Sequence, residues 1–86
     1  RFKVTRGILP DYSSEEGEGL RVDGVINNKP AKRAGMEKGD VIVAVDGKPV
    51  KNIYDYMYRL EECKPGQRIN VDVLRNGKNI TLIVDL

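Results

Sequence analysis

The stretch that decides the fold runs from Pro30 to Val50 and reads PAKRAGMEKGDVIVAVDGKPV. Its opening proline suits the first position of a helix, where no N–H is needed for a helical hydrogen bond. Gly35 can end that helix after about one turn by taking the left-handed conformation. The apolar run 41–45 predicts a strand buried on both faces, and Asp46-Gly47 predicts a tight turn. This order predicts the centre of a small β-rich domain.

Two further strands are predicted on the N-terminal side of this stretch. The first runs from Phe2 to Leu9, and the second from Leu20 to Ile26, with a change of phase near Gly24 that indicates a bulge or a close backbone approach. The segment Ser13 to Gly19 between them is acidic and has no apolar residue. We expect it to form an exposed loop.

One longer helix and a hairpin are predicted on the C-terminal side. Asn52 is a candidate N-cap with Asp55 in the first turn, and Pro65-Gly66 ends the helix. The apolar face of this helix, at spacings of three and four, contains Ile53, Tyr56, Met57, Leu60 and Cys63. Alternating apolar residues on both sides of Asn76-Gly77 predict the hairpin. We therefore expect an α+β, mainly β fold: a partly open barrel of five to six strands, capped by one short and one longer helix.

Length and charge limit the possible functions. The chain has 86 residues, 33% of them charged, with a net charge of +2. We expect a single domain over residues 1–86, and because the chain begins at Arg1 rather than Met, we expect it to be a piece of a larger protein. The two signs of charge are interspersed, which argues against nucleic-acid binding. No apolar run approaches the roughly 20 residues of a membrane helix.

Catalysis by this domain is not expected. The sequence contains no histidine, so Ser13, Ser14 and Cys63 lack the base that would most commonly activate them. Carboxylate pairs occur at Glu15-Glu16 and Glu61-Glu62, both at positions expected to be solvated. We expect no metal or cofactor in this domain. The single cysteine cannot form an internal disulfide.

The Pro30–Val50 stretch resembles the signature of PDZ domains. Residues 30–42 match P-A-x-x-A-G-[apolar]-x-x-G-D-x-[apolar], and residues 45–50 match [apolar]-[ND]-G-x-x-[apolar]. The segments Lys64-Pro65-Gly66 and Leu74 to Lys78 resemble the bacterial branch of the family, which includes PDZ domains of HtrA-type proteases. The resemblance covers nearly the whole chain and implies the PDZ fold.

The N-terminal part resembles a narrower group. Phe2 to Tyr12, followed by the acidic loop and Gly19 to Val25, is similar to PDZ domains attached to secreted or periplasmic bacterial zinc aminopeptidases. None of a metallopeptidase's zinc-binding residues maps onto this chain, so zinc would belong to the rest of such a parent. The resemblance implies a peptide-binding module of a larger peptidase, HtrA-like or aminopeptidase-like, in the periplasm or outside the cell.

The resemblance also implies a binding mode. A peptide C-terminus or an extended segment would add as a strand in a cleft between one sheet edge and the helix Asn52–Cys63, with its carboxylate on a glycine-containing loop. Ile8 would line the pocket for the terminal side chain. On the helix, we favour Tyr56 and Leu60 for the groove and Met57 for the core, although the whole row equally fits a core face. The implied residues are Thr5, Arg6, Gly7, Ile8, Leu9, Pro10, Tyr56, Leu60 and Cys63.

Three residues in or next to the first strand bear on this binding mode. Gly7 either lets backbone donors approach an anion or is an ordinary turn glycine. Arg6 stands where the family has an apolar residue, and either holds a carboxylate or is a solvated strand charge. Pro10 has no N–H, so one bond to a peptide would be missing, a loss of about 1 kcal/mol. We therefore expect weak or register-shifted binding. The alternative is a structural or intramolecular docking domain with a weak or occluded groove.

Three tyrosines complete the expected surface. Tyr12, Tyr54 and Tyr58 are predicted to be exposed, and exposed aromatic side chains are common at protein interfaces.

Overall fold

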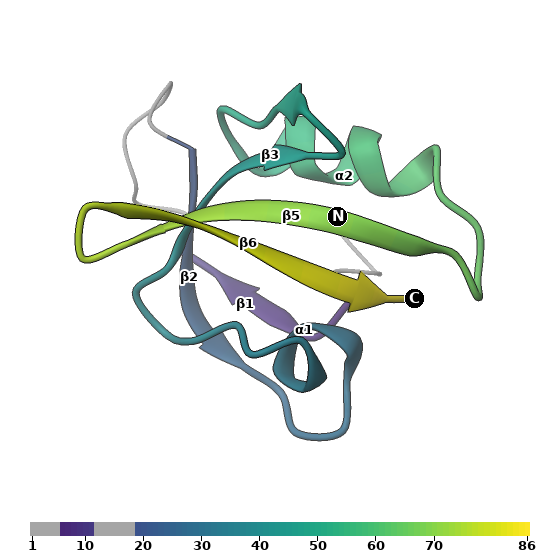
Figure 1. Cartoon of the computed structure of the whole chain (residues 1–86), viewed down its shortest axis with the longest axis horizontal. Coiled ribbons are helices and arrows are strands. Elements are labelled where there is room, and N and C mark those ends of the chain that lie inside the picture. The colour runs from purple at the N-terminus through teal and green to yellow at the C-terminus, as the bar shows by residue number, and fades with distance from the viewer. Residues whose placement is uncertain (1–5, 12–18) are drawn as a thin grey trace.

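The computed structural model of this chain describes residues 6–11 and 19–86 (Figure 1). Its elements, in chain order, are β1 (Ile8–Pro10), β2 (Leu20–Val25), α1 (Pro30–Arg33), β3 (Val41–Val45), β4 (Lys48–Pro49), α2 (Ile53–Glu61), β5 (Arg68–Arg75) and β6 (Lys78–Asp85). The mainly β fold with one short and one longer helix is as predicted.

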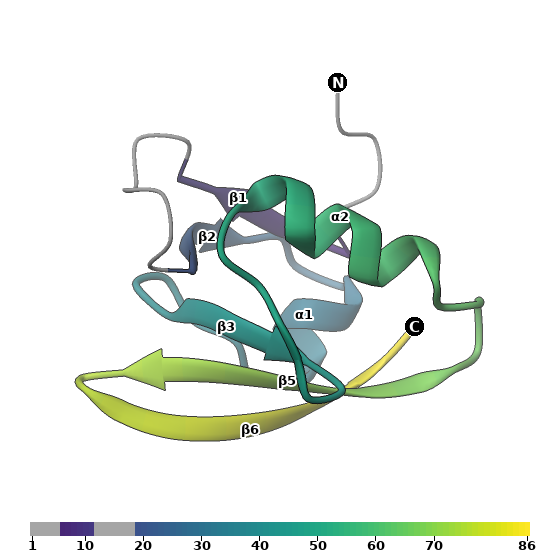
Figure 2. The same cartoon turned by 90° about the horizontal axis from the view of Figure 1, so that it is seen from above.

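The strands form one antiparallel sheet that stays open. Its order is β1-β2-β3-β5-β6, and the short β4 pairs with β3 off this path. Among the described strands, β1 and β6 are therefore the two ends of this order, and β4 is also paired on one side only. Figure 2 shows that β1 and α2 lie on the side of the molecule opposite the β5–β6 hairpin. The core collects apolar side chains from every element except β4.

Turn chemistry sets the strand registers. Asn76 and Gly77 have φ values of 54° and 77°, as a two-residue hairpin turn requires, and they place Arg75 opposite Lys78. Alternate residues of β5 and β6 are then buried, as the sequence predicted.

In β3, only Ile42 and Val45 are fully buried. The other three residues of β3 are partly buried and none is exposed, so the strand predicted to be buried on both faces is covered less completely than expected.

The β1–β2 pair contains the bulge that the sequence indicated. Leu9 pairs with Gly24 while Pro10 pairs with Val22, so Asp23 is the extra residue on β2. The predicted strand over residues 2–9 was wrong at Arg6 and Gly7, which form a turn with positive φ values of 60° and 94° before β1 begins at Ile8. The N-terminal part of that predicted strand, residues 2–5, lies outside the described residues, as does most of the predicted acidic loop.

A buried carboxylate fastens the loop after α1 to the sheet. Asp40 is 1% exposed and accepts hydrogen bonds from Arg75 Nε at 2.8 Å, Arg75 Nη2 at 2.7 Å and the Glu37 N–H at 2.9 Å. Arg75 Nη2 also donates to the Gly35 carbonyl at 2.9 Å. Bonds of this charge-assisted, two-pronged kind are the strongest that side chains make. The Gly-Asp turn of the motif is therefore held by one arginine of β5.

Candidate functional site

The outer edge of β1 is the first part of the predicted site. The Gly7 carbonyl accepts from the Ile26 N–H at 2.7 Å, and the Asp11 N–H donates to the Arg21 carbonyl at 2.9 Å, so these residues direct backbone groups toward β2. Backbone groups alternate along a strand, which places those of Ile8 and Pro10 on the opposite edge. The missing N–H of Pro10 therefore falls on the edge where a peptide would pair.

Two hydrogen bonds and one close packing contact hold the turn before β1. The Arg6 carbonyl accepts from the Ala31 N–H at 3.0 Å, and Gly7 is bonded to Ile26. Gly7 has a φ of +94°, and a Cβ on it would clash with Lys29 Cβ. The turn-glycine interpretation of Gly7 thus has a steric reason of its own. Anion binding by this loop stays a prediction, and Thr5 lies outside the described residues.

The β1 side chains divide between core and surface. Ile8 is 1% exposed and belongs to the core, whereas Leu9 is 51% exposed. Pro10 is half-buried. A role for Ile8 in a terminal side-chain pocket stays a prediction.

Arg6 is neither on a strand nor fully solvated. The residue is half-buried, and its Nε is the one buried side-chain nitrogen or oxygen among the described residues that has no hydrogen-bond partner. Its positive charge acts to lower the pKa of two side chains of the α2 region, Tyr56 and Cys63. Burial raises the pKa of Tyr56 far above its ordinary value, and the Arg6 charge acts in the opposite direction. Arg6 therefore reaches from the β1 turn toward α2.

The helix row does not divide as the sequence suggested. Tyr56 and Leu60, favoured for the groove, are 3% and 5% exposed and lie in the core, while Met57 is half-buried at its margin. Tyr54 and Tyr58 are each 63% exposed, as predicted. Tyr12 lies outside the described residues. Contact of Tyr56 and Leu60 with a peptide stays a prediction.

α2 is fixed to the sheet on its β4 side. Asn52 Oδ1 accepts from the Asp55 N–H at 2.9 Å, which confirms the predicted cap. Arg59 donates to the Pro49 carbonyl from Nε at 3.2 Å and from Nη2 at 3.0 Å, and Lys48 Nζ lies 3.3 Å from Glu62 Oε1. These contacts set the position of the helix without using β1.

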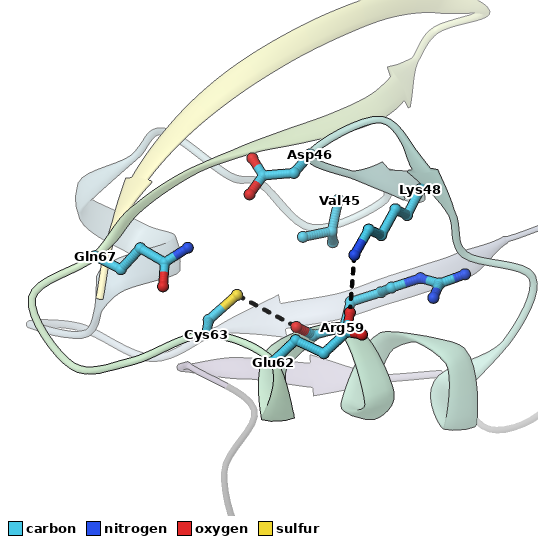
Figure 3. A pocket seen from close by; sticks show the side chains of 7 residues that line it. All are labelled: Val45, Asp46, Lys48, Arg59, Glu62, Cys63 and Gln67. Carbon is cyan, nitrogen blue, oxygen red and sulfur yellow. Dashed lines mark hydrogen bonds and ion pairs between the residues drawn. The ribbon is translucent and has the colours of Figure 1, made fainter.

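A cavity of about 100 Å³ lies between the end of α2 and the β3–β4 turn (Figure 3). It is lined by Val45, Asp46, Lys48, Arg59, Glu62, Cys63 and Gln67. Cys63 Sγ donates to the Arg59 carbonyl at 3.2 Å. Burial, Asp46 and Glu62 raise the pKa of this thiol, against the charges of Arg6 and Lys48. The structure thus places Cys63 in a cavity that the sequence did not predict and that contains no β1 residue.

Metal-ligating clusters and membrane-spanning helices are absent from the described part of the chain. No three or more His, Cys, Asp or Glu side chains come together there in a way that could hold a metal ion. No helix in residues 6–11 and 19–86 is long and apolar enough to cross a membrane.

Comparison with known proteins decides the family. A family model described as "PDZ domain" matches residues 1–86. The chain belongs to the PDZ domain family. It is 32% identical over 82 residues to a probable periplasmic serine endoprotease, DegP-like, of Pseudomonas fulva, covering 95% of this chain and 17% of that protein. The PDZ chain therefore spans less than a fifth of this relative's length.

Solved structures show the same fold in both predicted contexts. The "HtrA-type protease AlgW with decapeptide" superposes with a TM-score of 0.80 and 29% identity, covering 93% of this chain and 27% of that one. An aminopeptidase N family protein from Idiomarina loihiensis also gives a TM-score of 0.80, at 25% identity, covering 93% and 13% of the two chains. The resemblance to PDZ domains of the HtrA type, and to those of aminopeptidases, is thereby confirmed.

Proposed function

We propose that this PDZ domain binds a peptide C-terminus or an extended segment by strand addition to the outer edge of β1, next to α2. The observation that carries the proposal is the position of β1: it ends the sheet, and α2 lies on the same side of the molecule (Figure 2). In this binding mode an extended peptide pairs with an edge strand through its backbone, and a neighbouring helix supplies side chains for specificity.

Two further observations support a preformed site. The turn at Arg6 and Gly7 is bonded to both Ala31 and Ile26, and α2 is tied to β4 through Arg59 and Lys48. A site whose two walls are fixed in advance loses little conformational entropy when a ligand binds. The similar HtrA-type protease AlgW was solved with a decapeptide, which is consistent with this binding mode.

We also propose that the domain belongs to a peptidase of the bacterial envelope and does no chemistry itself. The absence of histidine from the chain supports the second part. The relatives support the first part, since they include a probable periplasmic serine endoprotease and an aminopeptidase N family protein. If the parent is an aminopeptidase, its zinc would bind outside this domain.

The test is a fluorescence anisotropy titration with a labelled decapeptide, with its C-terminus free or amidated. We expect a Kd above about 1 µM, because Pro10 cannot donate to the ligand strand. Restoring that donor with Pro10→Val should tighten binding about fivefold, whereas Pro49→Val on β4 should change nothing. Sub-micromolar binding that is lost on amidation would contradict the expected weakness.

Intramolecular docking is the second candidate, and Pro10 is the observation that favours it. A fixed segment of the parent chain needs fewer ladder bonds than a free peptide, because its local concentration is high. If no free peptide binds either wild type or Pro10→Val, the peptide-recognition proposal fails and docking becomes the better account.

A further inference from the structure

Arg6 is the most unusual charged side chain in the described structure. Its Nε is buried without a hydrogen-bond partner, and the guanidinium forms no ion pair with any described residue. A buried donor that is left unpaired destabilises the folded protein, more so when the group is charged. This destabilisation would be offset if the Arg6 guanidinium bound a group from outside the folded chain.

The two carboxylates that act on Cys63, as Arg6 does, have other hydrogen-bond or ion-pair partners. Asp46 Oδ1 accepts from the Asn70 N–H at 2.7 Å, and Glu62 pairs with Lys48 at 3.3 Å. The buried Asp40 accepts two hydrogen bonds from Arg75. The positive charge of Arg6 is therefore not neutralised by any of these groups.

The direction of the side chain points to the kind of partner. Arg6 lies in the turn directly before β1, which is on the same side of the molecule as α2 (Figure 2). The Arg6 charge also acts to lower the pKa of both Tyr56 and Cys63, in agreement with a guanidinium near α2. A guanidinium near α2 would contact a ligand side chain that points toward this helix. Arginine binds a carboxylate through two parallel N–H bonds, which is the strongest match available to it.

We propose that Arg6 makes this site select peptides with an Asp or Glu side chain at the last position, where the ligand faces α2. The inference rests on the proposed peptide site and adds its ligand class. An apolar side chain at that position would leave the guanidinium unpaired and would bury it further, so it should bind less well.

The test uses four labelled peptides of one sequence, ending in Glu or Val, each with a free or an amidated C-terminus. Wild type should bind the Glu peptide about tenfold more tightly than the Val peptide, whether or not the terminus is amidated. Arg6→Met, which keeps the length of the side chain, should abolish that preference. Lys78→Met at the hairpin turn removes the same charge elsewhere and should keep it.

The outcomes separate this inference from the proposed function. Equal binding of the Glu and Val peptides to wild type would overturn the selectivity and leave peptide binding intact. A preference for Glu that disappears on amidation would show that Arg6 reads the terminal carboxylate, which also overturns it. If none of the four peptides binds, the proposed function fails, and the inference with it. Arg6→Lys, which keeps the charge and loses the two-pronged geometry, should retain only part of the preference.

Discussion

Two arginines approach the interior of this domain, and their surroundings differ completely. Arg75 donates to both oxygens of the buried Asp40, at 2.8 and 2.7 Å, and to the Gly35 carbonyl at 2.9 Å. Arg6, in the turn before β1, buries its Nε with no partner. The first region joins a loop to a strand, while the second lies directly before β1, at one end of the sheet order.

The comparison distinguishes a charged side chain that stabilises the fold, Arg75, from one that we propose binds a ligand, Arg6. The buried Asp40 carboxylate and the partly exposed Arg75 guanidinium satisfy each other and need no outside partner, and removing Arg75 would leave a buried carboxylate without its partner. An unsatisfied guanidinium contributes nothing comparable to stability and gains most from an added anion. Stability and binding should therefore respond in opposite ways at the two arginines.

The largest effect is expected from Arg75→Met. It leaves Asp40 buried and uncompensated, so the free energy of unfolding should fall by about 3 kcal/mol in urea denaturation. Arg68→Met is the matched control, because Arg68 pairs with Asp85 at 2.7 Å and the two side chains are 71% and 68% exposed. That variant should lose less than about 1 kcal/mol. Equal losses in the two variants would remove the distinction between buried and surface pairs.

A smaller loss is expected from Gly7→Ala, in the turn that holds Arg6. Its matched control is Gly35→Ala, because both glycines have a φ of +94° but only the Cβ on Gly7 would meet another residue, Lys29. Positive φ should cost each variant about 1–2 kcal/mol, and overpacking should add at least about 1 kcal/mol to Gly7→Ala. Thermal unfolding measures the difference, and identical stabilities would show that the turn is not tightly packed.

Acid should weaken the Arg75 region. Burial acts to raise the pKa of Asp40, but the hydrogen bonds from Arg75 and Glu37 and the Arg75 charge outweigh it and hold that pKa below its ordinary value. A depressed folded pKa stabilises the protein above the unfolded pKa of about 3.9, and this stability is lost as pH falls through the folded pKa. Urea denaturation from pH 6 to pH 2 should show the decline.

The control for the acid experiment is a pair of amide variants. Asp40→Asn should lose part of the decline below about pH 4, because the titrating group is gone. Asp85→Asn removes an exposed carboxylate and should keep the wild-type profile. A wild-type profile in Asp40→Asn would mean that other groups cause the acid sensitivity.

The smallest effect on stability is expected from Arg6→Met. Removing an unpaired buried donor should leave the free energy of unfolding unchanged or raise it by up to about 1 kcal/mol. The measurement is the same urea denaturation as for Arg75→Met. A loss near that of Arg75→Met would mean that Arg6 supports the fold, and the contrast between the two arginines would disappear.

The sequence predicted the features that depend on local chemistry. Gly35, Asn52, Asp46-Gly47 and Asn76-Gly77 each require a particular backbone conformation or cap, and the structure has them all. The phase change near Gly24 likewise indicated the bulge at Asp23. Such signals lie within a few residues, so a single sequence is enough to detect them.

The features that the sequence did not predict depend on contacts between distant residues. The spacing of Tyr56, Met57 and Leu60 could not show which side of α2 faces the core, because all three fit one helix face. Arg75 and Asp40 form hydrogen bonds although they are 35 positions apart in the sequence. The lack of a hydrogen-bond partner for Arg6 Nε is visible only once the neighbouring residues are placed. The cavity at Cys63 likewise comes from three separate segments.

The most direct test of the β1–α2 site is an NMR titration of the ¹⁵N-labelled domain with the Glu-ended peptide. We expect the largest chemical-shift changes at Gly7, Ile8 and Leu9 and along the α2 residues next to them, with the β6 edge (Lys78–Asp85) unchanged. Changes centred on β6, or on Asp46 and Gln67 at the cavity, would contradict the account.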